Sequence, residues 1–108
     1  MDGFALIAEP TRRNILDRLR LREADVGELI ATLHLSQTLV SKHLRVLRDA
    51  GAVTVITVGK RRVYRLGVDP VPEVMAWVTP YHRMWAESLQ RLDAALAAEA
   101  THEDKERS

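Results

Sequence analysis

The sequence predicts a mainly α-helical protein with one β-hairpin, which places it in the α+β class. Three observations support this: apolar residues recur at helical spacing through about the first fifty residues, β-branched and aromatic residues dominate 52–66, and helical spacing returns after residue 70. With 108 residues, of which 46% are apolar and 29% charged, the chain suits one soluble domain with an appended helix.

The N-terminal part begins with a short apolar segment at 4–8, which we interpret as helical. Pro10 suits the first position of a second helix, because proline lacks the N–H that is unpaired there. Ile15, Leu16 and Leu19 give that helix its inward face.

Two further helices are marked by their caps. Asp25 and Glu28 have the spacing of a capping box, Ser36 suits the N-cap of the next helix, and Gly51 suits the position that ends it. Two helices joined by three or four residues predict a helix-turn-helix.

A two-stranded hairpin should follow, because segments 52–58 and 62–66 are strand-like and are separated by Gly59, Lys60 and Arg61. The order of helices, helix-turn-helix and hairpin is that of a winged helix. Asp69 and Pro70 open another helical region, within which Pro80 suggests a kink or a restart.

Charge is distributed unevenly along the chain. Residues 12–65 contain twelve lysines and arginines and five acids, a net charge of +7, whereas residues 69–108 carry a net charge of −4. The overall charge of +1 hides this division. We therefore expect the basic segment to face an anionic partner, double-stranded DNA.

The second helix of the motif has polar and basic residues where an exposed helix usually mixes acids and bases. A helix lying in the major groove presents such side chains to base edges and phosphates, although a solvated polar face is the alternative. His43 either lies near the DNA backbone or is packed or exposed to solvent. The candidate DNA-binding residues on this helix are Gln37, Thr38, Ser41, Lys42, His43 and Arg45.

The hairpin tip adds Lys60, Arg61 and Arg62 to the DNA-binding set, because three adjacent cations repel one another unless phosphates neutralise them. Simple solubility is the alternative. Arg12 and Arg13 lie at a helix start, where the helix dipole disfavours cations. Phosphate binding and a salt bridge to an acid such as Glu9 explain them equally well.

An apolar stripe follows in the C-terminal segment, longer than a core of this size can cover. We interpret it as a homodimer interface, with an effector pocket lined by the two tryptophans as the alternative. The interface residues are Trp77, Tyr81, Trp85, Leu89, Leu92 and Leu96.

Three segments, "AEPTRRNILDRL", "ELIATLHLSQTLVSKHLRVLRDAGAV" and "GKRRVYRL", resemble the ArsR/SmtB-type bacterial repressors over roughly residues 5–98. The resemblance implies a dimeric winged-helix regulator that represses nearby genes until a ligand releases it. Where the founding metal sensors carry "CVCDL", this chain has "DVGEL" at 25–29. The C-terminal "WVTPYHRMWAESLQRLDAAL" resembles the branch of the family that has no known metal site.

No metal site or cofactor is expected, because the chain has no cysteine and His34, His82 and His102 are dispersed. No catalytic motif is visible, so we do not expect an enzyme. Without an apolar run of membrane-spanning length or a signal peptide, a cytoplasmic protein associated with the nucleoid is expected. An unknown small-molecule effector is a further candidate partner.

The sequence therefore predicts a winged helix-turn-helix DNA-binding domain at 1–68, a dimerisation region at 69–99 and a disordered tail at 100–108. The predicted function is a homodimeric repressor that binds a palindromic operator. The alternative is a winged helix that serves as a protein-interaction module, since the fold is not tied to DNA.

Overall fold

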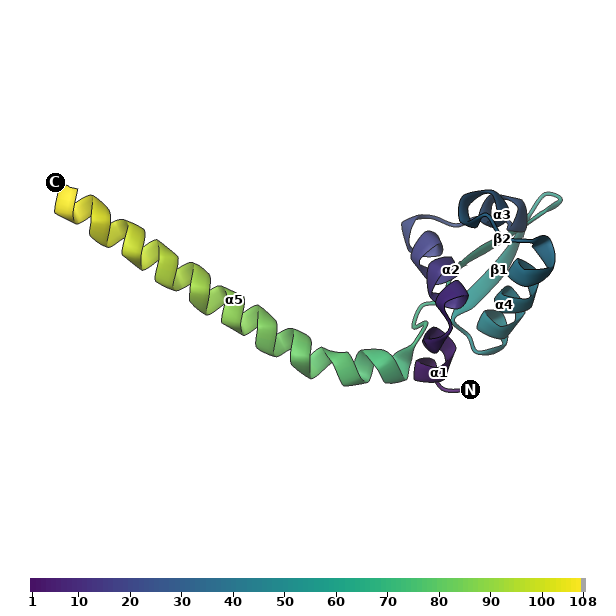
Figure 1. The fold of residues 1–108 in the computed structure, drawn as a ribbon, viewed down its shortest axis with the longest axis horizontal. Coiled ribbons are helices and arrows are strands. Elements are labelled where there is room, and N and C mark those ends of the chain that lie inside the picture. Colours follow the sequence, from purple (N-terminus) through teal and green to yellow (C-terminus); the bar gives the residue numbers. More distant parts are fainter. Residues whose placement is uncertain (108) are drawn as a thin grey trace. The chain divides into compact units, whose positions relative to one another are not determined.

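The computed structural model describes residues 1–107, with side chains through His102. The chain divides into two compact units, Met1–Val74 and the segment from Met75 onward. In the first unit, Figure 1 shows short helices gathered around a two-stranded hairpin. Its elements are α1 (Gly3–Ala8), α2 (Pro10–Leu21), α3 (Val26–Leu33), α4 (Gln37–Asp49), β1 (Val53–Val58) and β2 (Arg61–Leu66). The predicted winged-helix order is confirmed.

The helices begin where side chains can accept the unpaired N–H groups of their first turns. Asp25 Oδ1 accepts a hydrogen bond from the Glu28 N–H at 2.8 Å, and Glu28 Oε1 accepts one from the Asp25 N–H at 3.3 Å. The predicted capping box is therefore present at α3. Ser36 Oγ accepts from the Leu39 N–H at 3.1 Å and caps α4.

The turn between α3 and α4 depends on His34, which has a left-handed backbone with φ 56°. Its N–H donates to the Ile30 carbonyl at 2.9 Å and closes the last turn of α3. A non-glycine residue in this conformation costs roughly 1–2 kcal/mol. The surrounding packing must supply that energy, because α3 and α4 are held against each other and against α2.

The hairpin pairs β1 and β2 in antiparallel register, with Val53 opposite Leu66 and Val58 opposite Arg61. The turn thus contains only Gly59 and Lys60, and Arg61 belongs to β2 rather than to the loop. Gly59 has φ +63° at the first turn position, where a type II′ turn requires glycine.

The outer edge of β2 is also paired. The Tyr64 N–H donates to the Ala24 carbonyl at 2.8 Å, and the Ala24 N–H donates back to the Tyr64 carbonyl at 3.0 Å. This bridge ties the segment between α2 and α3 to the hairpin and covers an edge that could otherwise pair with another chain.

One apolar core holds the first unit together. Its largest fully buried side chains come from five of the six elements. Removing any one of these side chains would therefore loosen the packing between elements. Each such aliphatic side chain contributes roughly 1.5–3 kcal/mol through burial. They are Leu6, Ile15, Leu29, Val40, Leu44, Leu47 and Val53.

The second unit, from Met75 onward, lies within α5, which spans Pro72–Arg107. Pro80 lies inside α5 without ending it, and the Thr79 hydroxyl donates to the Met75 carbonyl at 2.6 Å in the turn before it. The helix continues through Arg107, whereas the sequence predicts a disordered tail at 100–108; Ser108 lies outside the described residues. Alanine, glutamate, lysine and arginine favour helix there, and glycine and proline are absent.

Candidate nucleic-acid interface

The outer face of α4 carries the polar residues predicted to read DNA. Val40, Leu44 and Leu47 turn into the core, and this orientation exposes the opposite side of the helix. The exposed residues on α4 include Gln37, Thr38, Ser41, Lys42, Arg45 and Arg48. Five of the six residues predicted on this helix, together with Arg48, therefore share an accessible surface.

His43 lies in the core rather than on this surface. Only 6% of the residue is exposed, and its Nε2 atom lies 3.8 Å from Glu9 Oε2. Within the part of the chain that the structure describes, its buried Nδ1 atom has no hydrogen-bond partner. His43 is therefore packed in the core and does not lie on the surface expected to contact DNA. Helical spacing accounts for its burial, because His43 follows buried Val40 by three positions.

Glu9 links this histidine to the start of α2. Its carboxylate accepts a hydrogen bond from the Arg12 N–H at 2.9 Å and caps α2. Burial acts to raise the pKa of Glu9, but the backbone bonds from Arg12 and Thr11 and the nearby His43 outweigh it and lower the pKa. Glu9 therefore stays ionised beside His43.

The three cations of the hairpin tip differ in whether their side chains are bonded within the fold. Arg61 donates from Nε and Nη2 to Asp25 Oδ2, at 3.0 and 2.8 Å, and also to Glu28 Oε1. The Glu28 N–H, followed by the Arg61 guanidinium, lowers the pKa of Asp25. The carboxylate of Asp25, followed by that of Glu28, raises the pKa of Arg61. Arg61 thus ties the hairpin to the capping box of α3.

Lys60 and Arg62 flank Arg61 in the sequence, and both are exposed. Neither of their side chains has a hydrogen bond or an ion pair with the residues that the structure describes. Successive side chains on a strand point to opposite faces, which separates Arg62 from Arg61. The sequence alone does not distinguish these three cations.

Arg12 and Arg13 have a role that differs from both phosphate binding and a salt bridge to Glu9. Arg12 donates to the carbonyls of Leu6 and Ala5 at 2.6 and 3.0 Å, and Arg13 donates to Ile7 at 2.7 Å. These are the carbonyls that the end of α1 leaves unpaired. The two guanidinium groups therefore cap α1, where a positive charge also suits the helix dipole.

The twelve cations of residues 12–65 thus form two groups. Five are bonded within the first unit: Arg12, Arg13, Arg18, Arg61 and Arg65. The other seven have no hydrogen bond or ion pair from their side chains to any residue that the structure describes: Arg20, Arg22, Lys42, Arg45, Arg48, Lys60 and Arg62.

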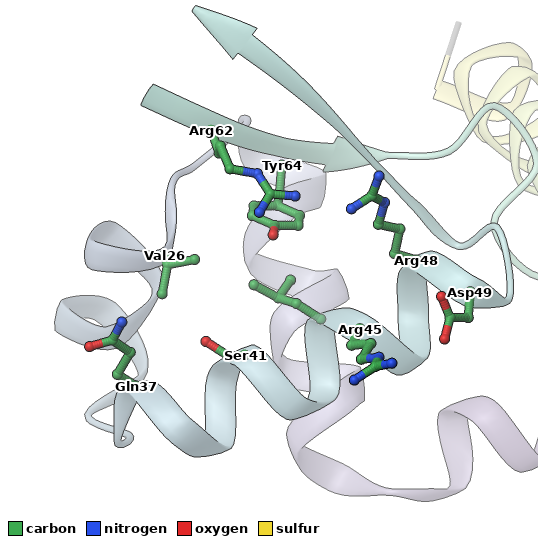
Figure 2. A pocket seen from close by; sticks show the side chains of 9 residues that line it. Val26, Gln37, Ser41, Arg45, Arg48, Asp49, Arg62 and Tyr64 are labelled. Atoms are coloured by element: carbon green, nitrogen blue, oxygen red, sulfur yellow. The ribbon is translucent and has the colours of Figure 1, made fainter. Parts of the chain in front are cut away.

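A groove of about 480 Å³ lies in the first unit between α4 and β2 (Figure 2). Arg48 and Arg62 extend into it from α4 and β2, and Gln37 and Ser41 lie along its α4 side. The groove is lined by Val26, Gln37, Ser41, Leu44, Arg45, Arg48, Asp49, Arg62 and Tyr64. Two of the candidate base-reading residues, Gln37 and Ser41, thus border the same groove as strand β2 of the hairpin.

On α5, the residues predicted for a dimer interface are exposed. Leu89 and Leu92 are 61% and 54% accessible, and the rings of Trp77 and Tyr81 lie 5.2 Å apart. The other residues of the stripe, Trp85 and Leu96, are also exposed.

Two kinds of feature are absent from the residues that the structure describes. No group of three or more histidine, cysteine, aspartate or glutamate side chains among them could hold a metal ion. None of their helices is long and apolar enough to span a membrane.

Comparison with known proteins associates this fold and surface with gene regulation. The family model described as "Bacterial regulatory protein, arsR family" matches residues 9–55. The HTH-type transcriptional regulator Rv2034 of Mycobacterium tuberculosis is 41% identical over 87 residues, which cover 81% of this chain and 78% of the relative.

Two further proteins are similar. The HTH-type transcriptional repressor SmtB of Mycobacterium tuberculosis is 43% identical over 60 residues, which are 56% of this chain and 44% of the repressor. A solved "Possible transcriptional regulator for arsenical resistance" is 36% identical with a TM-score of 0.65, covering 87% of this chain and 95% of the other. All three are named as transcriptional regulators rather than enzymes.

Proposed function

This chain belongs to the arsR family of bacterial regulatory proteins, and from that premise we propose that it is a homodimeric, sequence-specific repressor of nearby genes. DNA-binding transcription regulation follows from the family. Our proposal adds the dimer, the palindromic operator and the residues that contact DNA. It assigns DNA binding to residues 1–68 and dimerisation to residues 69–99.

Base reading is assigned to the first turns of α4, which would lie in the major groove. The Gln37 amide can form two hydrogen bonds with adenine, Lys42 can reach guanine, and the hydroxyls of Thr38 and Ser41 can bond to bases or phosphates. Arg45 and Arg48 lie further along the helix and suit phosphate contacts.

The hairpin is assigned to the minor groove and the DNA backbone through Lys60 and Arg62. Arg61 has a different role in this proposal: it holds the wing against α3. Its bonds to Asp25 and Glu28 would have to break before it could neutralise a phosphate.

Dimerisation is assigned to the apolar stripe of α5, because one winged helix reads only a short half-site. Two copies related by a two-fold axis would read two half-sites about one helical turn apart. If each copy buries several hundred Å² of apolar surface, the gross gain is on the order of 10 kcal/mol at about 25 cal/mol per Å². The loss of translational and rotational freedom on association offsets much of that gain, so the area of apolar surface that the stripe buries decides the strength of the dimer.

The observation that supports the proposal most is the position of the cations without internal partners. Of the seven such cations in the described part of residues 12–65, five lie on α4 and the hairpin, namely Lys42, Arg45, Arg48, Lys60 and Arg62, and the other two are Arg20 and Arg22. Five other arginines are bonded inside the fold. Exposed cations on one pair of elements are what a phosphate-binding surface requires.

Selection of binding sites from random duplexes tests the proposal. We expect enrichment of a palindrome and a log–log salt slope near −5 if about six phosphates are neutralised per dimer. Lys60→Ala with Arg62→Ala should flatten that slope, whereas Arg20→Ala with Arg22→Ala, which removes equal charge elsewhere, should change it less. Recovery of no common sequence would contradict the proposal and favour a protein-interaction module.

A further inference from the structure

The groove between α4 and β2 has features that DNA contacts do not require. Its 480 Å³ lies within the range of 300–1,000 Å³ that small-molecule sites occupy. Both the outer polar residues of α4 and the inner side of the hairpin line it (Figure 2). A phosphate group alone would fill only a small part of this volume.

Three guanidinium groups line the groove: Arg45, Arg48 and Arg62. Within residues 1–102, whose side chains the structure describes, none of them has a hydrogen bond or an ion pair. The single acid in the lining is Asp49, at the C-terminal end of α4. Like charges gathered around a concave surface raise the local positive potential, and an anion bound there would lower their mutual repulsion.

The floor of the groove is apolar, with Val26 and Leu44 among its lining residues. Tyr64 contributes the ring of a residue that is only 8% exposed, and its hydroxyl points from β2 toward α4 (Figure 2). Within the described residues that hydroxyl has no hydrogen-bond partner. A phenol that lines a hollow with an unused donor is suited to bind a polar ligand atom.

We propose that this groove binds a small organic anion, a carboxylate or phosphate monoester carried on an apolar body. The anionic group would lie between Arg48 and Arg62, and the body would cover Val26, Leu44 and the ring of Tyr64. Arginine favours such groups because its planar fork donates two parallel hydrogen bonds.

This ligand would compete with DNA, and that part of the inference rests on the proposed function. Gln37, Ser41 and Arg45 line the groove and also belong to the proposed DNA surface. A ligand that neutralises Arg48 and Arg62 removes phosphate contacts, so binding of either partner lowers the affinity for the other by the same factor.

The first experiment uses the full chain without DNA and phenyl phosphate as the probe, at constant ionic strength. Backbone NMR shifts should move at residues that line the groove and saturate at millimolar concentrations or below. Inorganic phosphate, which lacks the apolar body, should bind at least 10-fold more weakly. Equal binding of the two probes would overturn the proposal, because it would indicate general attraction of anions.

Paired variants test the residues. Arg48→Gln with Arg62→Gln should weaken phenyl phosphate at least 10-fold, while Arg20→Gln with Arg22→Gln, which removes the same charge outside the groove, should change it less than 2-fold. Tyr64→Phe removes only the hydroxyl and should weaken the probe about 3- to 10-fold, which provides a test should the arginine pair fail to fold. Equal losses in both arginine pairs, or no loss in Tyr64→Phe, would count against the site.

The second experiment adds the selected duplex. Phenyl phosphate should release it, and the released fraction should follow occupancy of the groove. Simultaneous binding of probe and duplex would overturn the competition. Binding of phenyl phosphate without any binding of duplex would refute the proposed function but support the anion site. Binding of duplex without binding of phenyl phosphate would refute only the anion site.

Discussion

Arginine residues of similar appearance in the sequence have different roles in this protein. Arg12 and Arg13 cap α1, Arg61 joins the hairpin to α3, and Arg62 has no partner among the residues that the structure describes. A guanidinium that already donates to carboxylates or carbonyls must break those bonds before it can bind a phosphate. The net charge of the segment therefore overstates the number of cations that are available to bind DNA phosphates.

Adjacent arginines in the hairpin allow a direct test of this distinction. We expect Arg61→Ala to lower the thermal midpoint, because it removes the bonds to Asp25 and Glu28, and to leave the salt slope of DNA binding nearly unchanged. Arg62→Ala should leave the midpoint unchanged and reduce the slope by about 2 per dimer, one contact in each copy. Calorimetry and salt titrations measure both, and the reverse pattern would contradict the assignment.

Gln37 is the exposed residue of α4 best suited to read a base. Gln37→Ala removes an amide without changing charge, so we expect a loss on the order of 1–3 kcal/mol on the selected site and little change on random DNA. Fluorescence anisotropy on both duplexes measures the difference. Equal losses on the two would make Gln37 a positioning contact.

Among the elements, α3 begins with a capping box whose carboxylates also bind a residue far along the chain. Asp25 and Glu28 form the capping box that their spacing predicts, and Arg61 then bonds to both carboxylates from 36 and 33 positions further along the chain. The wing is thus attached to the start of the helix-turn-helix. Its attachment depends on the charge of Asp25.

Acid should loosen that attachment. The pKa of Asp25 is lower in the folded state, so its contribution to stability is present above the ordinary value of 3.8 and is lost as the pH falls below it. Asp25→Asn keeps a capping oxygen but cannot ionise. We expect this variant to be less stable than the parent protein at pH 7, by a difference that shrinks at pH 3.

Urea unfolding at the two pH values measures that difference. Asp17→Asn is the matched control, because Asp17 is exposed and has no bonded partner in the described region. Its difference from the parent protein should remain nearly constant. A gap for Asp25→Asn that does not change between pH 7 and pH 3 would rule out the ion pair as its cause.

For the whole molecule, the proposed function depends on association through α5. Leu89 and Leu92 are exposed in the single chain, so replacing both with glutamate should not disturb the core of the first unit. We expect Leu89→Glu with Leu92→Glu to give a folded monomer that loses palindrome binding, because charge within an apolar interface is costly.

Sedimentation and duplex binding report the outcome. Gln90→Glu with Ala94→Glu is the control, since these exposed positions lie on the opposite side of α5 and also introduce two acids. The control should remain a dimer. A parent protein that sediments as a 12.2 kDa monomer at micromolar concentration, yet protects a full palindrome, would refute the interface.

Much of the architecture was predictable because its signals are local. The capping box at Asp25, the cap at Ser36 and the turn glycine at Gly59 act over a few residues, and helical spacing identified the buried side of α4. The same spacing contained the signal for burial of His43, which follows Val40 by three positions. The family resemblance came from these same segments.

The availability of each candidate DNA contact depended on tertiary structure. Pairing of β1 with β2 sets which side of the hairpin each arginine occupies, and docking of the hairpin on α3 brings Asp25 to Arg61 across 36 positions. Burial of His43 and the groove beside Tyr64 likewise require several elements to pack together. Sequence spacing carries local geometry, whereas the partner of a long charged side chain is whichever group the folded chain brings within its reach.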